Sequence, residues 1–335
     1  MATSKAKKAK KTSSAKSKAA SKAKATATAR TAKSAEVVVD KGAKKKADAK
    51  KTDVKVITSK KHSAVREFFA RKFDATENIL TIFKRGKIFG ALIGEAVGVM
   101  LITMIALTLG LFNPLYMVFG YLVITLAVFR LSGANLNPII TVGMLATRRM
   151  SAIRGVLYII AQILGAWLGY VVINGFYQVG LASGQISASS ASLPALTPAS
   201  DLTIATEGFS MFWPIVLLEF MGAIVIAFAY ARALTYKRSA FTFASVVAAG
   251  VFLALLLAVV ICSNYLYISD TVFVMNPAVA FVYGLFPGDA EGFDALMKAL
   301  MPMLVTYVIF PVLGGALGFY LSDISSKLAG EELAN

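Results

Sequence analysis

The chain has 335 residues, of which 57% are hydrophobic, and a formal net charge of +17 at pH 7. It contains one cysteine, Cys262, so an internal disulfide is excluded. It also contains one histidine, His62, so it has few of the side chains from which metal sites and catalytic triads are built. Residues 1–87 hold 26 of the 35 Lys and Arg and 7 of the 18 Asp and Glu. The composition predicts a hydrophobic membrane body behind a basic segment, with no metal and no cofactor.

Residues 1–61 form a low-complexity segment of Lys, Ala, Ser and Thr. Such a segment buries too little apolar surface to offset the entropy lost on ordering, so we expect a disordered tail. It has no apolar core of the kind found in secretory signal peptides. Two roles stay open for the tail: a solvated cytoplasmic extension, or electrostatic attraction to anionic lipid or nucleic acid.

Residues 62–87 form a juxtamembrane segment with a different pattern. Large apolar residues such as Phe68, Phe69 and Phe73 recur at roughly helical spacing among Arg and Lys. This pattern is typical of an amphipathic helix lying in the membrane interface, although a simple linker is the alternative.

Six longer apolar stretches follow, each long enough or nearly so to cross a hydrocarbon core of roughly 30 Å as a helix. Their approximate limits are 88–109, 114–131, 153–177, 212–234, 241–262 and 295–321. We place a channel domain at 88–322, with a short tail at 323–335. The loop 178–211, rich in Ser, Ala and Pro, contains no Lys or Arg.

Basic residues near the spans indicate their orientation. All but Lys298 fall on the side of the N-terminus: Lys84, Arg85, Lys87, Arg130, Arg148, Arg149, Arg154, Arg232, Lys237, Arg238 and Lys327. Because positive charge is retained on the cytoplasmic side, both termini are predicted to be cytoplasmic in a multi-pass protein of the lipid bilayer. The sequence does not identify which membrane.

Two Asn-Pro pairs interrupt the apolar pattern. Asn137-Pro138 lies between the second and third spans, and Asn276-Pro277 lies between the fifth and sixth. Asn is a good N-cap and Pro is tolerated as the first residue of a helix, so each pair predicts a short helix preceded by extended backbone. Such breaks in matching positions of two hydrophobic halves indicate a transport site.

Other features also repeat between the halves. Glu95 lies in the first span and Glu219 in the fourth, while the third span contains 162–166 (QILGA) and the sixth contains 311–315 (PVLGG). Because each half has three spans, the second half must be inverted relative to the first. The two short helices are then expected to meet at their N-termini near the midplane, with both Asn side chains adjacent.

These motifs, in this order, resemble those of the aquaporin (major intrinsic protein) family over about residues 88–322. The resemblance implies an all-α membrane fold of six tilted helices and two re-entrant half-helices in an inverted repeat. It also implies one pore per subunit, a homotetramer, and Glu95 and Glu219 bracing the re-entrant loops. We favour this bracing role over proton relay for the two carboxylates.

The selectivity filter departs from the family pattern. The arginine that normally follows the second motif is replaced by Val279, and the aspartate found after it in many glycerol-conducting members is replaced by Ala280. Carried over by spacing, the other filter positions are Phe273, Asn264 and, in the second span, Phe119 or Met117. In the first motif, the usual alanine after Asn-Pro is replaced by the bulkier Ile139.

The residues therefore predict a passive channel for water or small neutral solutes such as glycerol, with Asn137 and Asn276 as donors at the pore midpoint. A filter without positive charge leaves room for small uncharged solutes larger than water and relaxes the exclusion of protons and cations. The sequence does not decide between water and glycerol as the solute. The alternatives are a poorly conducting or ion-permeable relative, and a membrane anchor for the basic tail. An enzyme is not expected, because no nucleophile–base pair accompanies the helix N-termini.

Overall fold

The computed structural model describes residues 82–83, 86–110, 114–186, 205–206, 209–210, 212–236, 239–266, 273–283 and 292–330. The chain divides into two units, Met1–Phe68 and Phe69–Asn335, and every described residue belongs to the second. The basic tail predicted at 1–61 lies outside the described residues, as does nearly all of the juxtamembrane segment predicted at 62–87.

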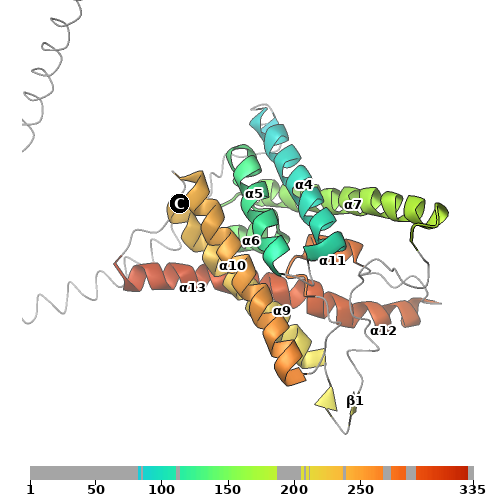
Figure 1. Ribbon diagram of the computed structural model, residues 1–335. Coiled ribbons are helices and arrows are strands. Elements are labelled where there is room, and N and C mark those ends of the chain that lie inside the picture. Colours follow the sequence, from blue (N-terminus) through green and yellow to red (C-terminus); the bar gives the residue numbers. More distant parts are fainter. Residues whose placement is uncertain are drawn as a thin grey trace, which may run out of the picture. The chain divides into compact units, whose positions relative to one another are not determined.

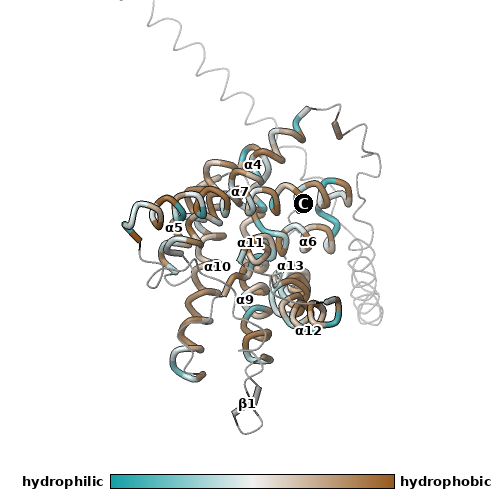
Figure 2. The backbone as a smooth tube through the Cα atoms, turned by 90° about the vertical axis from the view of Figure 1, so that its right-hand side faces the viewer, coloured by the Kyte–Doolittle hydropathy of each residue, from teal (hydrophilic) through white to brown (hydrophobic). Residues whose placement is uncertain are grey.

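The described residues form six helical spans long and apolar enough to cross a membrane, which confirms the predicted all-α membrane fold. Brown, the colour of hydrophobic residues, dominates these helices in Figure 2. Their elements are α4 (Lys87–Ile105) with η1 (Ala106–Gly110), α5 (Pro114–Ser132), α7 (Ala152–Ala182), α9 (Phe212–Ala233) with η2 (Leu234–Tyr236), α10 (Ala240–Ile261) with η3 (Cys262–Leu266), and α12 (Phe293–Leu304) with η4 (Val305–Ile309) and α13 (Phe310–Leu328).

The sixth span is assembled from three of these elements, which follow one another along one line in Figure 1. Pro302 lies inside α12 and removes one backbone donor, and the wider turn η4 follows it. The hydroxyl of Thr306 donates to the Pro302 carbonyl oxygen at 2.8 Å. Beside the helices, β1 (Ala205–Thr206) pairs with β2 (Phe209–Ser210) in an antiparallel ladder of two residues each.

Two short helices begin at the Asn-Pro motifs, as the sequence predicts. α6 (Pro138–Ala146) has Asn137 as its N-cap, and α11 (Pro277–Val282) has Asn276. Each short helix packs against the third span of the opposite half: α6 against α13, and α11 against α7. The two halves are therefore interlocked through their short helices.

Glycines allow the first and third spans of each half to cross at close range. A Cβ atom added to Gly165 in α7 would lie 2.2 Å from the Ala96 carbonyl oxygen in α4. In the second half, a Cβ atom on Gly314 in α13 would lie 2.6 Å from the Phe220 carbonyl oxygen in α9. Both carbonyls belong to the residue that follows the buried glutamate of its half, so the two crossings match.

The match continues one turn further along each crossing. A Cβ atom on Gly169 would meet the Met100 carbonyl oxygen at 2.6 Å, and one on Gly318 would meet that of Ile224 at 2.5 Å. Each pair lies four residues beyond the first pair on both helices. The repeat between the two halves is therefore present in the packing of the backbone.

α13 continues to Leu328, beyond the boundary that the sequence places at residue 322. Asp323 pairs there with Arg149, which follows α6, through nitrogen–oxygen distances of 2.6 and 3.3 Å. Both side chains of this pair are buried. Tyr320 also donates from its hydroxyl to the Ala146 carbonyl oxygen at 2.8 Å, so α13 holds the C-terminal end of α6.

Candidate functional site: the junction of the two re-entrant segments

Both re-entrant segments reach their short helix through an unusual backbone conformation. Leu136 has φ 57° and Met275 has φ 46°, and each immediately precedes its capping Asn. Left-handed φ values are uncommon for residues with a Cβ and persist where surrounding contacts fix them. In this chain, a buried glutamate supplies such contacts to each segment.

Glu95 holds the first segment through both carboxylate oxygens. Oε1 accepts from the Asn135 backbone N–H at 2.9 Å, and Oε2 accepts from that of Leu136 at 2.7 Å. The Gln162 amide also donates to Oε2 at 2.8 Å. Backbone donors buried at membrane depth need such acceptors, because hydrocarbon offers none.

Glu219 contacts the second segment in the same way. Its two oxygens accept from the backbone N–H groups of Val274 at 2.7 Å and Met275 at 2.9 Å. The position that Gln162 occupies in the first half is Pro311 in the second, following the alignment of 162–166 with 311–315. Glu219 thus accepts two backbone hydrogen bonds but has, among the described residues, no counterpart of the hydrogen bond that Gln162 donates to Glu95.

The two capping asparagines lie at one junction and exchange hydrogen bonds between halves. Each Oδ1 caps its own helix, accepting from Ile139 N at 2.9 Å for Asn137 and from Ala278 N at 3.1 Å for Asn276. The amide of Asn137 donates to the Met275 carbonyl oxygen at 2.8 Å. The amide of Asn276 donates to that of Leu136 at 3.1 Å. The expected adjacency of the two motifs is thus present in the structure.

Tyr121 of α5, which the sequence motifs do not indicate, also reaches this junction. Its side chain is 6% exposed, and its hydroxyl oxygen lies 3.4 Å from the Asn276 amide nitrogen. The Asn137 side chain lies close to the same hydroxyl. Tyr121 follows Met117 by four residues, so the two side chains lie on the same face of α5. This spacing from a filter candidate was the sequence feature that could have indicated Tyr121 as a pore residue.

The structure separates the two filter candidates of the second span. Met117 is 5% exposed and belongs to the same buried cluster as Phe273 and Val279. Phe119 is 62% exposed and lines an outer groove between α4, α5 and α7. Asn264, in η3, is exposed, and its amide donates to the Val260 carbonyl oxygen one turn earlier. Of these filter positions, the buried cluster therefore contains Met117, Phe273 and Val279.

Comparison with known proteins places this architecture in a family. The family profile described as Major intrinsic protein matches residues 110–321. Aquaporin-1 of Ovis aries is 44% identical over 59 residues, which cover 17% of this chain and 22% of that protein. Aquaporin-1 of Sus scrofa is 36% identical over 85 residues, covering 25% and 29% of the two chains. The matched segments thus span less than a third of these relatives.

A solved structure extends the likeness to the whole fold. The X-ray structure of the aquaglyceroporin from Plasmodium falciparum has a TM-score of 0.53 and 18% identity, and the match covers 72% of this chain and 99% of that one. At this identity the likeness concerns the fold alone. The family profile covers well over half of the present chain, from just after the first span to residue 321 in the sixth. The chain therefore belongs to the major intrinsic protein family.

Proposed function

We propose that this protein is a passive channel for water and small neutral solutes, whose pore passes the junction of α6 and α11. The reciprocal contacts of Asn137 and Asn276 carry this proposal, because they hold two amide groups at the meeting point of the half-helices. Such amides donate to the oxygen of a water or hydroxyl, while apolar walls hold the solute weakly enough to release it. Glu95 and Glu219 act in this proposal as braces for the two segments.

Tyr121 forms, in this proposal, an additional constriction at the pore midpoint. The Asn276 amide has two N–H donors, and its two acceptors are the Leu136 carbonyl oxygen at 3.1 Å and the Tyr121 hydroxyl at 3.4 Å. The longer contact is the weaker one, so a passing water replaces the Tyr121 hydroxyl and leaves the contact to Leu136 in place. The phenol ring must also move aside for the solute.

We expect Tyr121→Phe to raise the osmotic water permeability roughly fivefold, because displacing a neutral hydrogen bond of about 1 kcal/mol is no longer required. Tyr121→Val should raise it further, since the ring is removed as well. The measurement is light-scattering shrinkage of proteoliposomes after an osmotic step with an impermeant osmolyte. Phe119→Val is the control on the same helix, and its permeability should equal that of the native chain. Shrinkage no faster than that of empty liposomes for the native chain and both Tyr121 variants would refute the channel.

Met117, Phe273 and Val279 are all buried apolar residues of the core. We take these three residues to form an uncharged filter on the outer side of this midpoint. A guanidinium at residue 279 would occupy space and exclude cations. We therefore expect Val279→Arg to slow glycerol uptake at least tenfold and to change water permeability much less. Re-swelling of the same vesicles in glycerol measures this effect, and equal glycerol uptake by both chains would count against the assignment of Val279 to the filter.

The Tyr121 contact also favours a second candidate function, that of a poorly water-conducting relative. In that case vesicles that contain the native chain shrink slowly after an osmotic step, and vesicles that contain Tyr121→Val shrink fast. The uncharged filter adds the further possibility of ion leak, which planar-bilayer conductance measures. We also propose that both termini are cytoplasmic, that the protein is a homotetramer, and that the basic tail binds anionic lipid or nucleic acid, with the channel body as its membrane anchor.

A further inference from the structure

Thr125 of α5 is fully buried, and its hydroxyl has no hydrogen-bond partner among the described residues. A threonine in a helix can satisfy its hydroxyl by donating to the carbonyl oxygen four residues earlier. Thr108, Thr147 and Thr306 of this chain all do so, at 2.8 Å. The Thr125 hydroxyl makes no such bond, and a buried polar group is costly unless water or a ligand satisfies it.

The position of Thr125 on α5 directs its side chain toward the re-entrant segments. It follows Tyr121 by four residues, so the two side chains lie on the same face, about 6 Å apart along the helix axis. Tyr121 contacts the Asn276 amide at the junction. Phe119 and Val123, on the opposite face of α5, are exposed. The unpartnered hydroxyl is therefore on the inward side of the helix.

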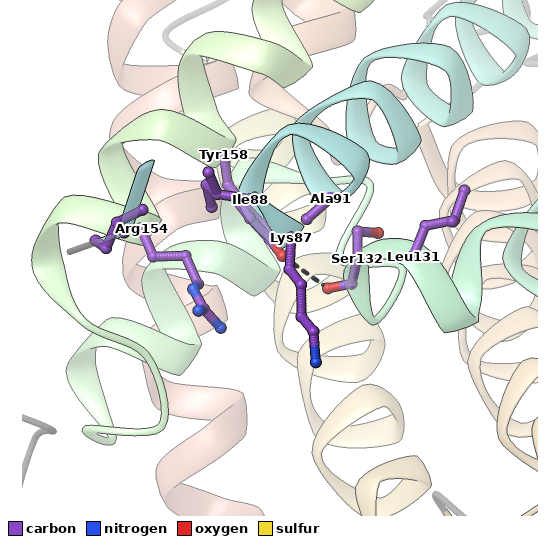
Figure 3. A pocket seen from close by; sticks show the side chains of 8 residues that line it. Lys87, Ile88, Ala91, Leu131, Ser132, Arg154 and Tyr158 are labelled. Atoms are coloured by element: carbon purple, nitrogen blue, oxygen red, sulfur yellow. Dashed lines mark hydrogen bonds between the residues drawn. The ribbon is translucent and has the colours of Figure 1, made fainter. Parts of the chain in front are cut away.

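The first re-entrant segment runs back along this part of α5. The chain leaves α5 at Ser132, whose carbonyl oxygen accepts from the Tyr158 hydroxyl at 2.9 Å, the bond drawn as a dashed line in Figure 3. Four residues later, Leu136 has returned to the level of Ile124. A Cβ atom on Gly98 would lie 2.3 Å from the Leu136 side chain and 3.4 Å from that of Ile124. The threonine that follows Ile124 is thus level with this segment.

We propose that the Thr125 hydroxyl is a second hydrogen-bonding contact for the solute, one helical turn from Tyr121 toward the start of the first re-entrant segment. This inference rests on the proposed channel and adds a residue to its pore. The Asn137 and Asn276 amides donate to a solute, whereas a hydroxyl both donates and accepts. A water or alcohol that leaves the junction therefore finds a partner there and does not pass the apolar wall without a hydrogen bond.

This role is the opposite of the one proposed for Tyr121. The Tyr121 hydroxyl must give up the Asn276 amide when a solute passes, so its contact slows the solute. The Thr125 hydroxyl has no partner among the described residues to give up, so its contact with a solute is a net gain. Removal of the two hydroxyls should therefore change permeability in opposite directions.

The test replaces the Thr125 hydroxyl by a methyl group of similar size. We expect Thr125→Val to lower the osmotic water permeability of proteoliposomes about fivefold, because the solute loses one neutral hydrogen bond on its path. Thr125→Ser keeps a hydroxyl and should retain at least half of the native permeability. Glycerol re-swelling of the same vesicles should follow the same order.

Thr103→Val is the matched control. The Thr103 hydroxyl is also buried without a partner among the described residues, but its side chain packs against α7, where a Cβ atom on Gly169 would lie 3.0 Å from it. The two substitutions thus remove the same group from different places, and Thr103→Val should leave permeability unchanged. Thermal unfolding in detergent should show neither valine variant less stable than the native chain, since valine leaves no polar group unsatisfied.

The outcomes separate this inference from the proposed channel. Native permeability in Thr125→Val would overturn the inference and leave the channel intact. A loss that Thr125→Ser does not restore would assign Thr125 to packing, which also overturns the inference alone. Vesicles with the native chain that shrink no faster than empty liposomes would refute the channel and the contact together.

Discussion

Glu219→Leu is expected to abolish solute flux through the proposed channel and to lower the stability of the folded chain by several kcal/mol. The substitution leaves the backbone N–H groups of Val274 and Met275 without the acceptors they now have at 2.7 and 2.9 Å. Leaving a buried donor unsatisfied costs roughly 1–3 kcal/mol, and two donors are affected. Without the carboxylate, the left-handed conformation of Met275 loses its support, and Asn276 is displaced from the junction.

The substitution Glu219→Gln gives a graded comparison. A glutamine keeps one oxygen for one backbone donor and turns an amide N–H toward the other, so its effect should lie between those of glutamate and leucine. Leu217→Ala is the matched control, since Leu217 lies two residues away on α9 and is exposed. Flux in proteoliposomes and thermal unfolding in detergent measure the series. Native flux in Glu219→Leu would show that the carboxylate does not brace the segment.

Gly165→Val is expected to prevent the native packing of α7 against α4. Even the first carbon of the side chain would stand 2.2 Å from the Ala96 carbonyl oxygen, which is backbone and cannot rotate away. Overpacking of side chains alone costs typically 1–3 kcal/mol, and a backbone clash forces the helices apart, so we expect more than about 3 kcal/mol. Separation of the two helices would also move Glu95 away from Asn135 and Leu136.

Gly175→Val on the same helix is the control for this experiment. A Cβ atom at Gly175 meets nothing within 4 Å, so the same change in helix propensity occurs there without the clash. The fraction of monodisperse protein in size-exclusion chromatography and the unfolding temperature are the measurements. Similar losses in the two variants would mean that glycine at residue 165 matters for backbone flexibility and not for the close approach.

The features predicted correctly from sequence are those with local chemical causes. Asn137 and Asn276 are N-caps, because a buried Asn-Pro pair has few other conformations in which the Asn side chain finds hydrogen-bond partners. Glu95 and Glu219 stand at matching places because a carboxylate is tolerated at membrane depth only with donors around it. The structure shows both helix caps and both sets of carboxylate contacts, while the roles of these four residues in a pore remain proposals.

The details missed from sequence depend on how the helices are rotated and where they end. α5 is apolar on all sides, so its residues do not reveal that Met117 and Tyr121 face inward and Phe119 faces outward. α13 runs to Leu328, past the domain boundary predicted at residue 322, and it includes Asp323. In the structure its charge is buried against Arg149, a residue 174 positions away. Such long-range pairing leaves no local signal.

The exchange of hydrogen bonds between the halves has a consequence for how the protein is made. Asn137 donates to the carbonyl oxygen of a residue 138 positions later in the chain. At a synthesis rate of about 5–20 residues per second, that partner emerges roughly 7–28 s after Asn137. During this interval the first re-entrant segment has its cap but lacks the partner for its amide. Until residue 275 is synthesised, the Asn137 amide must therefore donate to another acceptor, such as water or the insertion machinery.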